Sequence, residues 1–244
     1  MISDPFEVAF NDYLGGRNDA SILVHCNKGD DELIPISYFF RSFNQMPQIE
    51  QVALKFCEGK VLDIGAGSGS HSLILKERGI DVTSLDIKPG FVKIMQERGL
   101  NNTIQSDILN YKHGGYDTLL MLMNGIGFTK NFKGLSAFLK QAKGLLNKGG
   151  QLIFDSSDLL YLYQNDDGSY LINLNDNYYG EVEYVVEYNG LKGEPFEWLY
   201  IDFGNLSLIA EESGFKCELL MEDDHYNYLA RLFWYLYWDS YHKG

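Results

Sequence analysis

The chain has 244 residues, enough for one large hydrophobic core or for a core domain with additions. No apolar run approaches the roughly 20 residues that a membrane-spanning helix requires, and no basic region followed by an apolar block opens the chain, so we expect neither a membrane anchor nor a signal peptide. Three cysteines and five histidines are scattered without the spacing of metal ligands, which argues against a zinc site or a disulfide framework and favours a cytoplasmic protein.

Charge and tyrosine are unevenly distributed along the chain. Residues 1–154 carry 16 acidic and 16 basic side chains, whereas residues 155–244 carry 18 acidic and 4 basic ones, so the last third holds the whole net charge of −14. Of the 17 tyrosines, 13 lie at or after Tyr161. Because a negative surface repels phosphate groups, this distribution argues against DNA or RNA as a partner.

Two helices, at residues 3–14 and 46–58, are expected before the first core strand. That strand is a short apolar run at residues 61–64 that contains one acid, Asp63. A helix is expected again at residues 70–78. Between strand and helix, three glycines at alternate positions let the backbone turn tightly and approach a ligand without Cβ clashes: Gly65, Gly67 and Gly69. Strand, glycine turn and helix in this order predict a nucleotide-type cofactor site at the carboxyl end of a sheet.

The second core strand is expected at residues 81–87, where a short apolar run ends in Asp86 and Ile87. A carboxylate at this place can accept hydrogen bonds from both hydroxyls of a ribose. The alternative is an aspartate that simply ends the strand in solvent.

Two more strands extend the regular part of the core. One lies at residues 102–106, and the other, at residues 116–123, is a nearly continuous apolar run that suits the centre of a sheet. A pair of candidate contact residues follows each strand: Asp107 and Ile108 after the first, Asn124 and Gly125 after the second.

The segment Leu-Asp-Ile-Gly-Ala-Gly-Ser-Gly at residues 62–69 resembles motif I of the class I S-adenosylmethionine-dependent methyltransferases. Its third glycine comes two positions after the second, whereas the dinucleotide-binding fingerprint places it three positions after. The resemblance covers about residues 60–155 with specific motifs and residues 204–234 by the order of elements alone. It implies S-adenosyl-L-methionine as the cofactor.

The resemblance further implies cofactor contacts at each of these strand ends. They are Asp63, Gly65, Ala66, Gly67 and Gly69 for the cofactor cradle, Asp86 for the ribose, Ile87 for the adenine face, Asp107 for the adenine amino group, Ile108 beside the ring, and Asn124 and Gly125 for the methionine part. N-terminal additions in the family often fold over the cofactor, so Tyr38 and Arg41 are expected in a lid. There Arg41 would bind the cofactor carboxylate or form an ordinary surface ion pair.

For the fold class, the resemblance implies a doubly wound α/β protein with a mostly parallel seven-stranded sheet, in the order 3-2-1-4-5-7-6 with the last strand antiparallel. Residues 178–188 and 194–202 are expected to form an inserted β-hairpin around the turn Asn189-Gly190. The expected domains are an N-terminal helical cap or lid (1–58), a cofactor-binding core (59–155 and 204–244) and an insertion covering the acceptor site (156–203).

A fifth strand is expected at residues 151–155, and the last two at residues 215–221 and 226–234. The loops after the fourth, fifth and sixth strands should meet, because the carboxyl ends of parallel strands share one edge of a sheet. Three side chains in these loops are candidates for a general base: His225, Asp155 and Asp158. Each has a plain structural alternative, such as a role for His225 as a cap within its acidic turn. A base is needed only if the acceptor must lose a proton, since alignment of acceptor, methyl and sulfur provides much of the catalysis.

The acidic, tyrosine-rich last third would suit a cationic or amine-bearing acceptor, because aromatic faces with nearby carboxylates attract cations. Against this, tyrosine is favoured in half-buried strands, and surface acids commonly only interact with water. We favour methyl transfer to a small molecule. The alternatives are a methyltransferase that acts on a protein or another macromolecule, and a nicotinamide-dependent oxidoreductase or non-catalytic nucleotide binder.

Overall fold

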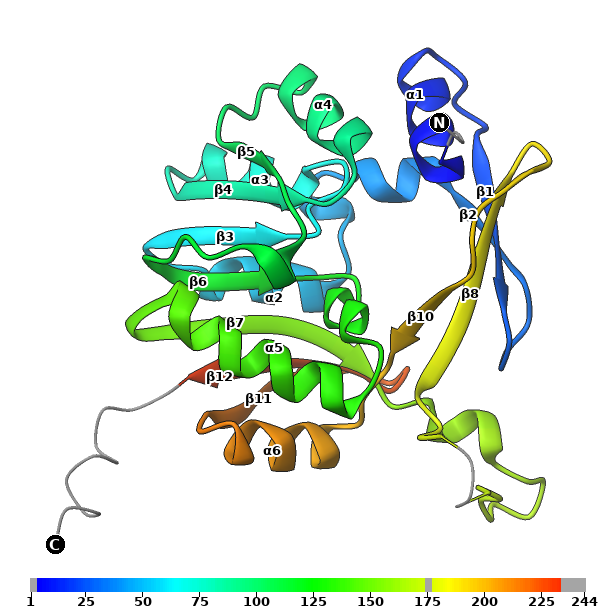
Figure 1. The fold of residues 1–244 in the computed structure, drawn as a ribbon. Helices are drawn as coiled ribbons and strands as arrows, with labels where there is room; N and C mark the ends of the chain where they lie inside the picture. The colour runs from blue at the N-terminus through cyan, green and yellow to red at the C-terminus, as the bar shows by residue number, and fades with distance from the viewer. Residues whose placement is uncertain (1–3, 174–176, 234–244) are drawn as a thin grey trace, which may run out of the picture.

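The computed structural model describes residues 4–173 and 177–233. Its larger sheet has seven strands in the order β5-β4-β3-β6-β7-β12-β11 (Figure 1). The bounds of these strands are β3 (Lys60–Ile64), β4 (Asp81–Asp86), β5 (Thr103–Gln105), β6 (Tyr116–Met121), β7 (Leu146–Ser157), β11 (Lys216–Glu222) and β12 (Asn227–Phe233). The last strand, β12, runs antiparallel to both β7 and β11, while β3 to β7 pair in parallel. The strand order and the antiparallel last strand are therefore confirmed.

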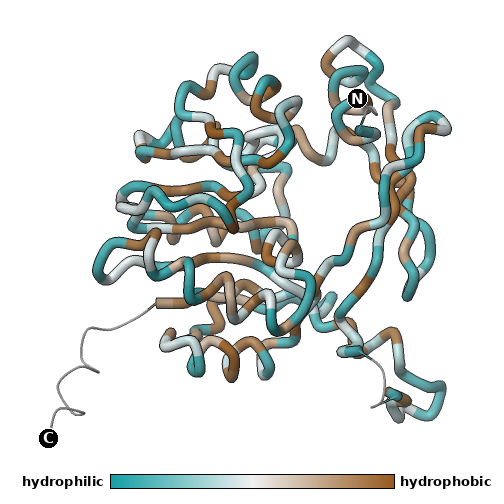
Figure 2. The backbone as a smooth tube through the Cα atoms, in the orientation of Figure 1, coloured by the Kyte–Doolittle hydropathy of each residue, from teal (hydrophilic) through white to brown (hydrophobic). Residues whose placement is uncertain are grey.

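The central strands are apolar because helices cover both faces of the sheet. Leu62 in β3 and Leu119 in β6 are fully buried, and Figure 2 shows hydrophobic stretches along the strands of this sheet. On one face, Leu54 and Leu75 from α2 and α3 join the core. On the other, Phe138 from α5 joins Leu62 and Leu119. The helices are α1 (Pro5–Leu14), α2 (Gln48–Phe56), α3 (Ser70–Glu77), α4 (Pro89–Glu97), α5 (Phe132–Leu145) and α6 (Phe203–Glu212).

A second sheet has five strands: four lie in the order β10-β8-β1-β2, and the short β9 pairs with β8. Its bounds are β1 (Ser21–Cys26), β2 (Glu32–Pro35), β8 (Glu181–Tyr188), β9 (Leu191–Lys192) and β10 (Phe196–Leu199). The predicted insertion supplies β8 to β10. The N-terminal region supplies β1 and β2, which the sequence analysis did not predict because it assigned that region to a helical cap. Short strands depend on their neighbours: β1 pairs with β2 on one side, and on the other side with residues 184–187, far along the chain.

The second sheet stands across the carboxyl ends of β3, β6 and β7, and α1 lies beside it (Figure 1). A separate apolar cluster ties these parts together, since Phe10 of α1 packs with Ile22, Phe91 and Val186. Short 3₁₀ helices complete the connections: η1 (Ile36–Phe40), η2 (Phe43–Gln45), η3 (Ile108–Asn110), η4 (Gly125–Thr129) and η5 (Leu159–Tyr163). Across residues 4–173 and 177–233, every helix is too short or too polar to cross a bilayer.

Candidate active site

A cavity of about 1070 Å³ lies between the carboxyl edge of the larger sheet and the second sheet. It is lined by residues of the glycine loop, of the segment from η1 to Arg41, and of the second sheet. All of the predicted site residues line it except four: Gly69, Asn124, Asp155 and Asp158. The fold thus brings together side chains that the sequence placed at the ends of separate strands.

The glycine loop leaves bare backbone facing the cavity. Gly65 and Gly67 have φ values of 70° and 54°, in the left-handed region that glycine adopts without strain. The amides of Gly65 and Ala66 donate to the Leu85 carbonyl at 2.9 and 3.1 Å, which fastens the turn to the end of β4. A Cβ built on Gly65 would have no atom within 4 Å, so this position faces open space. Gly69 instead starts α3 and packs against Leu100.

Asp86 connects the ends of two strands. Its Oδ2 accepts the Gly67 amide at 3.0 Å, and its Oδ1 accepts the Lys88 amide at 2.9 Å. Burial raises the pKa of Asp86, and these two hydrogen bonds oppose that rise. Each carboxylate oxygen keeps a further lone pair for a ligand. The neighbouring Ile87 is 59% exposed, which leaves an apolar surface at the cavity wall.

Asp107 takes up a similar position at the end of β5. It caps η3, where its Oδ1 accepts the Leu109 amide at 2.9 Å and its Oδ2 accepts the Asn110 side-chain amide at 3.1 Å. Ile108 is buried, with part of its surface in the cavity wall. Together with Asp86, this second strand-end carboxylate gives the cavity two acceptors next to apolar side chains.

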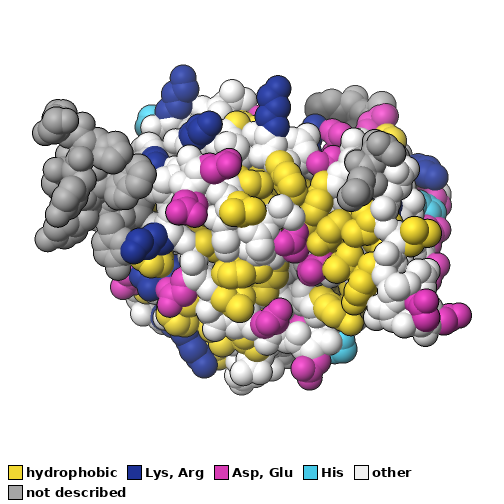
Figure 3. All heavy atoms as spheres, turned by 90° about the horizontal axis from the view of Figure 1, so that it is seen from below, with side chains coloured by type: hydrophobic (Ala, Val, Ile, Leu, Met, Phe, Trp, Pro, Cys, Tyr) yellow, Lys and Arg dark blue, Asp and Glu magenta, His cyan; other side chains and the backbone are white. Residues whose placement is uncertain are grey.

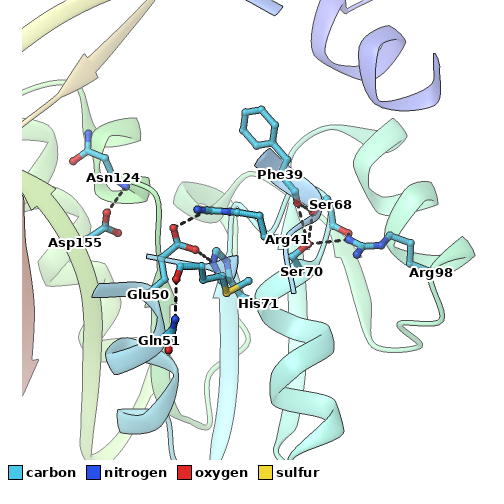
Figure 4. A network of polar contacts seen from close by, with 11 residues as sticks. Phe39, Arg41, Glu50, Gln51, Ser68, Ser70, His71, Arg98, Asn124 and Asp155 are labelled. Carbon is cyan, nitrogen blue, oxygen red and sulfur yellow. Dashed lines mark hydrogen bonds and ion pairs between the residues drawn. The ribbon is translucent and has the colours of Figure 1, made fainter. Parts of the chain in front are cut away.

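A buried ion triad lies beside the glycine loop (Figure 4). Glu50 of α2 is only 2% exposed, and it accepts from Arg41 Nη2 at 2.7 Å and from His71 Nε2 at 2.8 Å. Burial alone would raise the pKa of Glu50, but the hydrogen bond and charge of His71, with those of Arg41, hold it below its ordinary value. Burial would lower the pKa of His71, yet the bond to Glu50 and the charge of Asp63 raise it.

Glu50 was not among the predicted residues, although the sequence contained a signal for it. It lies on the buried face of α2 with Ile49, Ala53 and Leu54. A lone acid on the apolar face of an amphipathic helix needs a buried partner, because an unpaired charge in the interior is strongly unfavourable. The helical spacing could therefore have marked Glu50, but not its partners.

The η1 segment is fastened over the glycine loop. The Phe39 carbonyl accepts hydrogen bonds from the hydroxyls of Ser68 and Ser70, the latter at 2.9 Å (Figure 4). The Arg41 guanidinium lies over the Tyr38 ring, with Cζ 3.7 Å from the ring centroid. Arg41 Nε is buried without a hydrogen-bond partner. This arrangement places a cation, already held by Glu50, in the wall of the cavity.

The candidate bases occupy three different settings. Asp155 lies behind the loop that follows β6, where its Oδ2 accepts the Asn124 amide at 3.0 Å. Burial raises the pKa of Asp155 to about 6 against this hydrogen bond. Asp158 accepts from the Leu160 amide and from the Tyr179 hydroxyl at 2.8 Å, outside the cavity lining. His225 is exposed in the turn between β11 and β12 and lines the cavity.

The second sheet contributes aromatic residues that the sequence analysis did not single out individually. The hydroxyls of Tyr184 and Tyr200 lie 2.9 Å apart, and Trp198 Nε1 donates to the Asn124 carbonyl at 3.1 Å. Burial raises the pKa of both tyrosines, so their hydroxyls stay protonated at neutral pH. The excess of tyrosine in the last third was the available signal. Within the described ranges, no three His, Cys, Asp or Glu side chains are grouped as a metal site would require.

The doubly wound sheet, the bare glycine loop and the strand-end carboxylates define a nucleotide-type cofactor site of the Rossmann-like class. A family model for a methyltransferase domain matches residues 62–154. A solved S-adenosylmethionine-dependent methyltransferase from Bacteroides fragilis, in complex with S-adenosyl-L-homocysteine, is 39% identical, with a TM-score of 0.88 over 96% of this chain and 95% of that one. The chain therefore belongs to the class I S-adenosylmethionine-dependent methyltransferases, and its cofactor is S-adenosyl-L-methionine.

Two curated relatives match over shorter stretches. Human glycine N-methyltransferase is 27% identical over 117 residues, which cover 39% of this chain and 40% of that protein. The 23S rRNA (uracil(747)-C(5))-methyltransferase of Pyrococcus horikoshii is 33% identical over 101 residues, which cover 38% of this chain and 24% of that protein. The chain thus matches about a quarter to two fifths of the length of these relatives, whose names specify different methyl acceptors.

Proposed function

We propose that this enzyme methylates a small molecule that binds between the two sheets, next to the cofactor. The observation that carries the proposal is one continuous cavity, whose wall includes the glycine loop at one end and Tyr184, Trp198 and Tyr200 at the other. Its volume of about 1070 Å³ reaches the upper end of the roughly 300–1,000 Å³ typical of one small ligand. It therefore has room for an acceptor beside the cofactor.

The residues at the glycine-loop end of the cavity, here called the cofactor wall, fit the cofactor. The bare backbone at Gly65 and Gly67 would allow close approach, and Asp86 would accept from the ribose hydroxyls while Ile87 covers the adenine face. Asp107 would accept from the adenine amino group. Arg41, with an unpartnered Nε, would pair with the carboxylate of the methionine part. When bound, the cofactor supplies an electrophilic methyl group on its sulfonium.

Residues 59–155 and 204–244 would form the core that binds the cofactor, with Arg41 added from the lid, and the remainder of segments 1–58 and 156–203 would select the acceptor. This division follows from the lining, since the second sheet combines strands from both of the latter segments. Its tyrosines are protonated and so would act as hydrogen-bond partners rather than bases. Of the three candidate bases, His225 lines the cavity and would be the one to accept a proton.

An amine-bearing acceptor suits the part of the cavity near Tyr184 and Tyr200 best. The pKa of Tyr200 rises chiefly through burial, with further contributions from Cys26 and from the charges of Asp155 and Glu32, so the charges of two carboxylates reach this ring. Aromatic faces near carboxylates attract cations. Figure 3 shows acidic side chains among hydrophobic ones on one face of the molecule, with basic side chains along its rim. The net charge of −14 repels phosphate and argues against RNA as acceptor.

The test is release of S-adenosyl-L-homocysteine from a panel of small molecules, in which each amine is paired with an alcohol of the same shape. Amines should be methylated and their alcohol partners should not. Turnover of only phenols or carboxylates would remove the amine assignment, and turnover of only RNA or protein would remove the small-molecule assignment. The Asp86→Ala variant serves as the control for cofactor-dependent signal.

A further inference from the structure

The backbone that follows β6 has an unusual conformation. Met123 and Asn124 have φ values of 60° and 54°, so two successive residues with side chains adopt the left-handed region. This region is sterically unfavourable for a side chain such as that of Met123, although asparagine tolerates it better, and two such residues in succession persist only where surrounding contacts enforce them. Met123 lines the cavity, so the strained backbone lies at the site where methyl transfer is proposed.

Hydrogen bonds from two separate sheets hold Asn124. From the larger sheet, Asp155 Oδ2 accepts the Asn124 amide at 3.0 Å. From the second sheet, Trp198 Nε1 donates to the Asn124 carbonyl at 3.1 Å, and the Leu199 carbonyl accepts from Asn124 Nδ2 at 3.3 Å. Asn124 is 7% exposed, so water cannot replace these partners easily.

The indole of Trp198 also packs directly against the loop. A Cβ built on Gly127 would lie 2.1 Å from Trp198 Nε1 and 2.3 Å from its Cδ1. Real side chains do not approach so closely, and here the neighbour is a rigid ring rather than a flexible chain end. Gly127 is thus a glycine because Trp198 occupies the place where its side chain would lie.

We propose that Trp198 and Asp155 are positioning residues that clamp the Met123–Asn124 backbone from opposite sides. The proposal rests on the proposed function only in treating this edge as the place of methyl transfer. Asp155 then acts as a hydrogen-bond acceptor for the Asn124 amide, not as the base that removes a proton from the acceptor molecule. Through this hydrogen bond Trp198 links the position of the second sheet to the loop that follows β6.

Asp155 is tested by comparing Asp155→Asn with Asp155→Ala. The asparagine side chain keeps an oxygen that can accept the Asn124 amide, whereas alanine leaves that buried amide unpaired. Asp155→Ala should weaken S-adenosyl-L-methionine binding roughly 5- to 100-fold in calorimetry, and Asp155→Asn should stay within about threefold of the parent protein. The dependence of turnover on pH should be the same in Asp155→Asn and the parent.

Trp198 is tested through its coupling to Gly127. Trp198→Phe keeps an aromatic ring but loses the N–H, and should weaken cofactor binding roughly two- to tenfold. Gly127→Ala should weaken binding strongly in the parent protein but hardly at all in a Trp198→Ala background, because the clash is then absent. Thermal melting of each variant separates these effects from loss of folding.

Two results would overturn the clamp. One is an Asp155→Asn variant as defective as Asp155→Ala with a changed pH profile, which would assign Asp155 to proton transfer. The other is an equal effect of Gly127→Ala with and without Trp198. Both readouts use S-adenosyl-L-methionine alone or any acceptor that the panel identifies, so failure of the amine assignment leaves this test intact.

Discussion

The two walls of the cavity are encoded in different ways. On the cofactor wall, each predicted contact lies next to the end of a strand, and the glycine loop, Asp86 and Asp107 follow one another within 43 positions of sequence. The opposite wall joins β1 and β2 near the N-terminus to β8 and β10, so that Leu23 pairs with Glu187 and Cys26 with Tyr184. Motifs therefore mark the proposed cofactor contacts, whereas the opposite wall, where we propose that the acceptor binds, arises from pairing between distant segments.

This difference implies that variants of the two walls should affect different properties. Variants of the cofactor wall should change stability or S-adenosyl-L-methionine affinity, and variants of the second sheet should change acceptor use. Glu50 and Trp198 are the exceptions. Glu50 joins α2 to Arg41 and to His71 of α3, and Trp198 joins the second sheet to Asn124 after β6.

Loss of Glu50 should have the largest effect. Removing one partner of a buried ion pair costs about 3–5 kcal/mol, so Glu50→Ala should lower the free energy of unfolding by about that amount. Glu50→Gln keeps the shape and one acceptor oxygen and should lose less. Denaturant unfolding measures both, with the exposed Glu77→Gln as a control that should stay within about 0.5 kcal/mol of the parent. An equal effect of Glu50→Ala and Glu77→Gln would contradict the triad.

The Glu50 effect should also depend on pH. The pKa of Glu50 is lowered from 4.5, so its contribution is present above that value and is lost as pH falls through the lowered pKa. The pKa of His71 is raised from 6.5, so its contribution is complete below that value and is lost as pH rises through the raised pKa. The stability difference between the parent and Glu50→Gln should therefore be greatest between about pH 4.5 and 6.5.

Gly69 and Gly65 should respond in opposite ways to alanine. Both have positive φ values, which cost roughly 1 kcal/mol for alanine. At Gly69 the new Cβ would lie 2.6 Å from Leu100 Cδ1, so overpacking should bring the total loss of stability to about 2–4 kcal/mol. At Gly65 the methyl group would project into open space and should weaken cofactor binding instead. Denaturant unfolding and calorimetry on both variants test this expectation. It would be refuted if Gly65→Ala were less stable than Gly69→Ala.

Asp86 and Asp107 form a matched pair on the same wall. Asp86→Ala removes the acceptor of two backbone amides and the proposed ribose contact, and should weaken S-adenosyl-L-methionine binding about a hundredfold, or about 2.7 kcal/mol. Asp107→Ala should weaken it about three- to tenfold, because one adenine contact is lost. Calorimetry measures the loss of affinity in both variants. A larger loss of affinity for Asp107→Ala than for Asp86→Ala would contradict the proposed contacts.

Tyr184→Phe should have the smallest effect and the most selective one. It removes one hydroxyl from the second sheet and should raise KM for the methyl acceptor about two- to tenfold. The affinity for S-adenosyl-L-methionine should not change, since Tyr184 bonds to Tyr200 and not to the cofactor wall. Steady-state kinetics with the acceptor from the panel measures this, and a parallel loss of cofactor affinity would break the separation between the walls.

Much of the larger sheet could be predicted because its elements carry local signals. Each of these signals lies within a few residues of sequence. They are the apolar run of β6, the turn at Gly65 and Gly67, and the acid that ends β4. The expected hairpin of residues 178–188 and 194–202 also formed, as β8 and β10, and the short β9 in the connection pairs with β8 as well. The N-terminal strands β1 and β2 were missed, because six and four residues of weak alternation are a weak local signal and the sheet that they join is completed by β8, far along the chain.

The amino-acid sequence by itself determined the family resemblance, since that depends on short apolar runs, glycine spacing and strand-end acids that act over a few neighbouring residues. The class of fold, the strand order and the cofactor followed from that resemblance. Only the tertiary structure decided which side chains share the ion triad of Arg41, Glu50 and His71, and which aromatic residues face the glycine loop. Those contacts join positions that are far apart in the chain, and burial and hydrogen bonding between such positions exist only once the two sheets have come together.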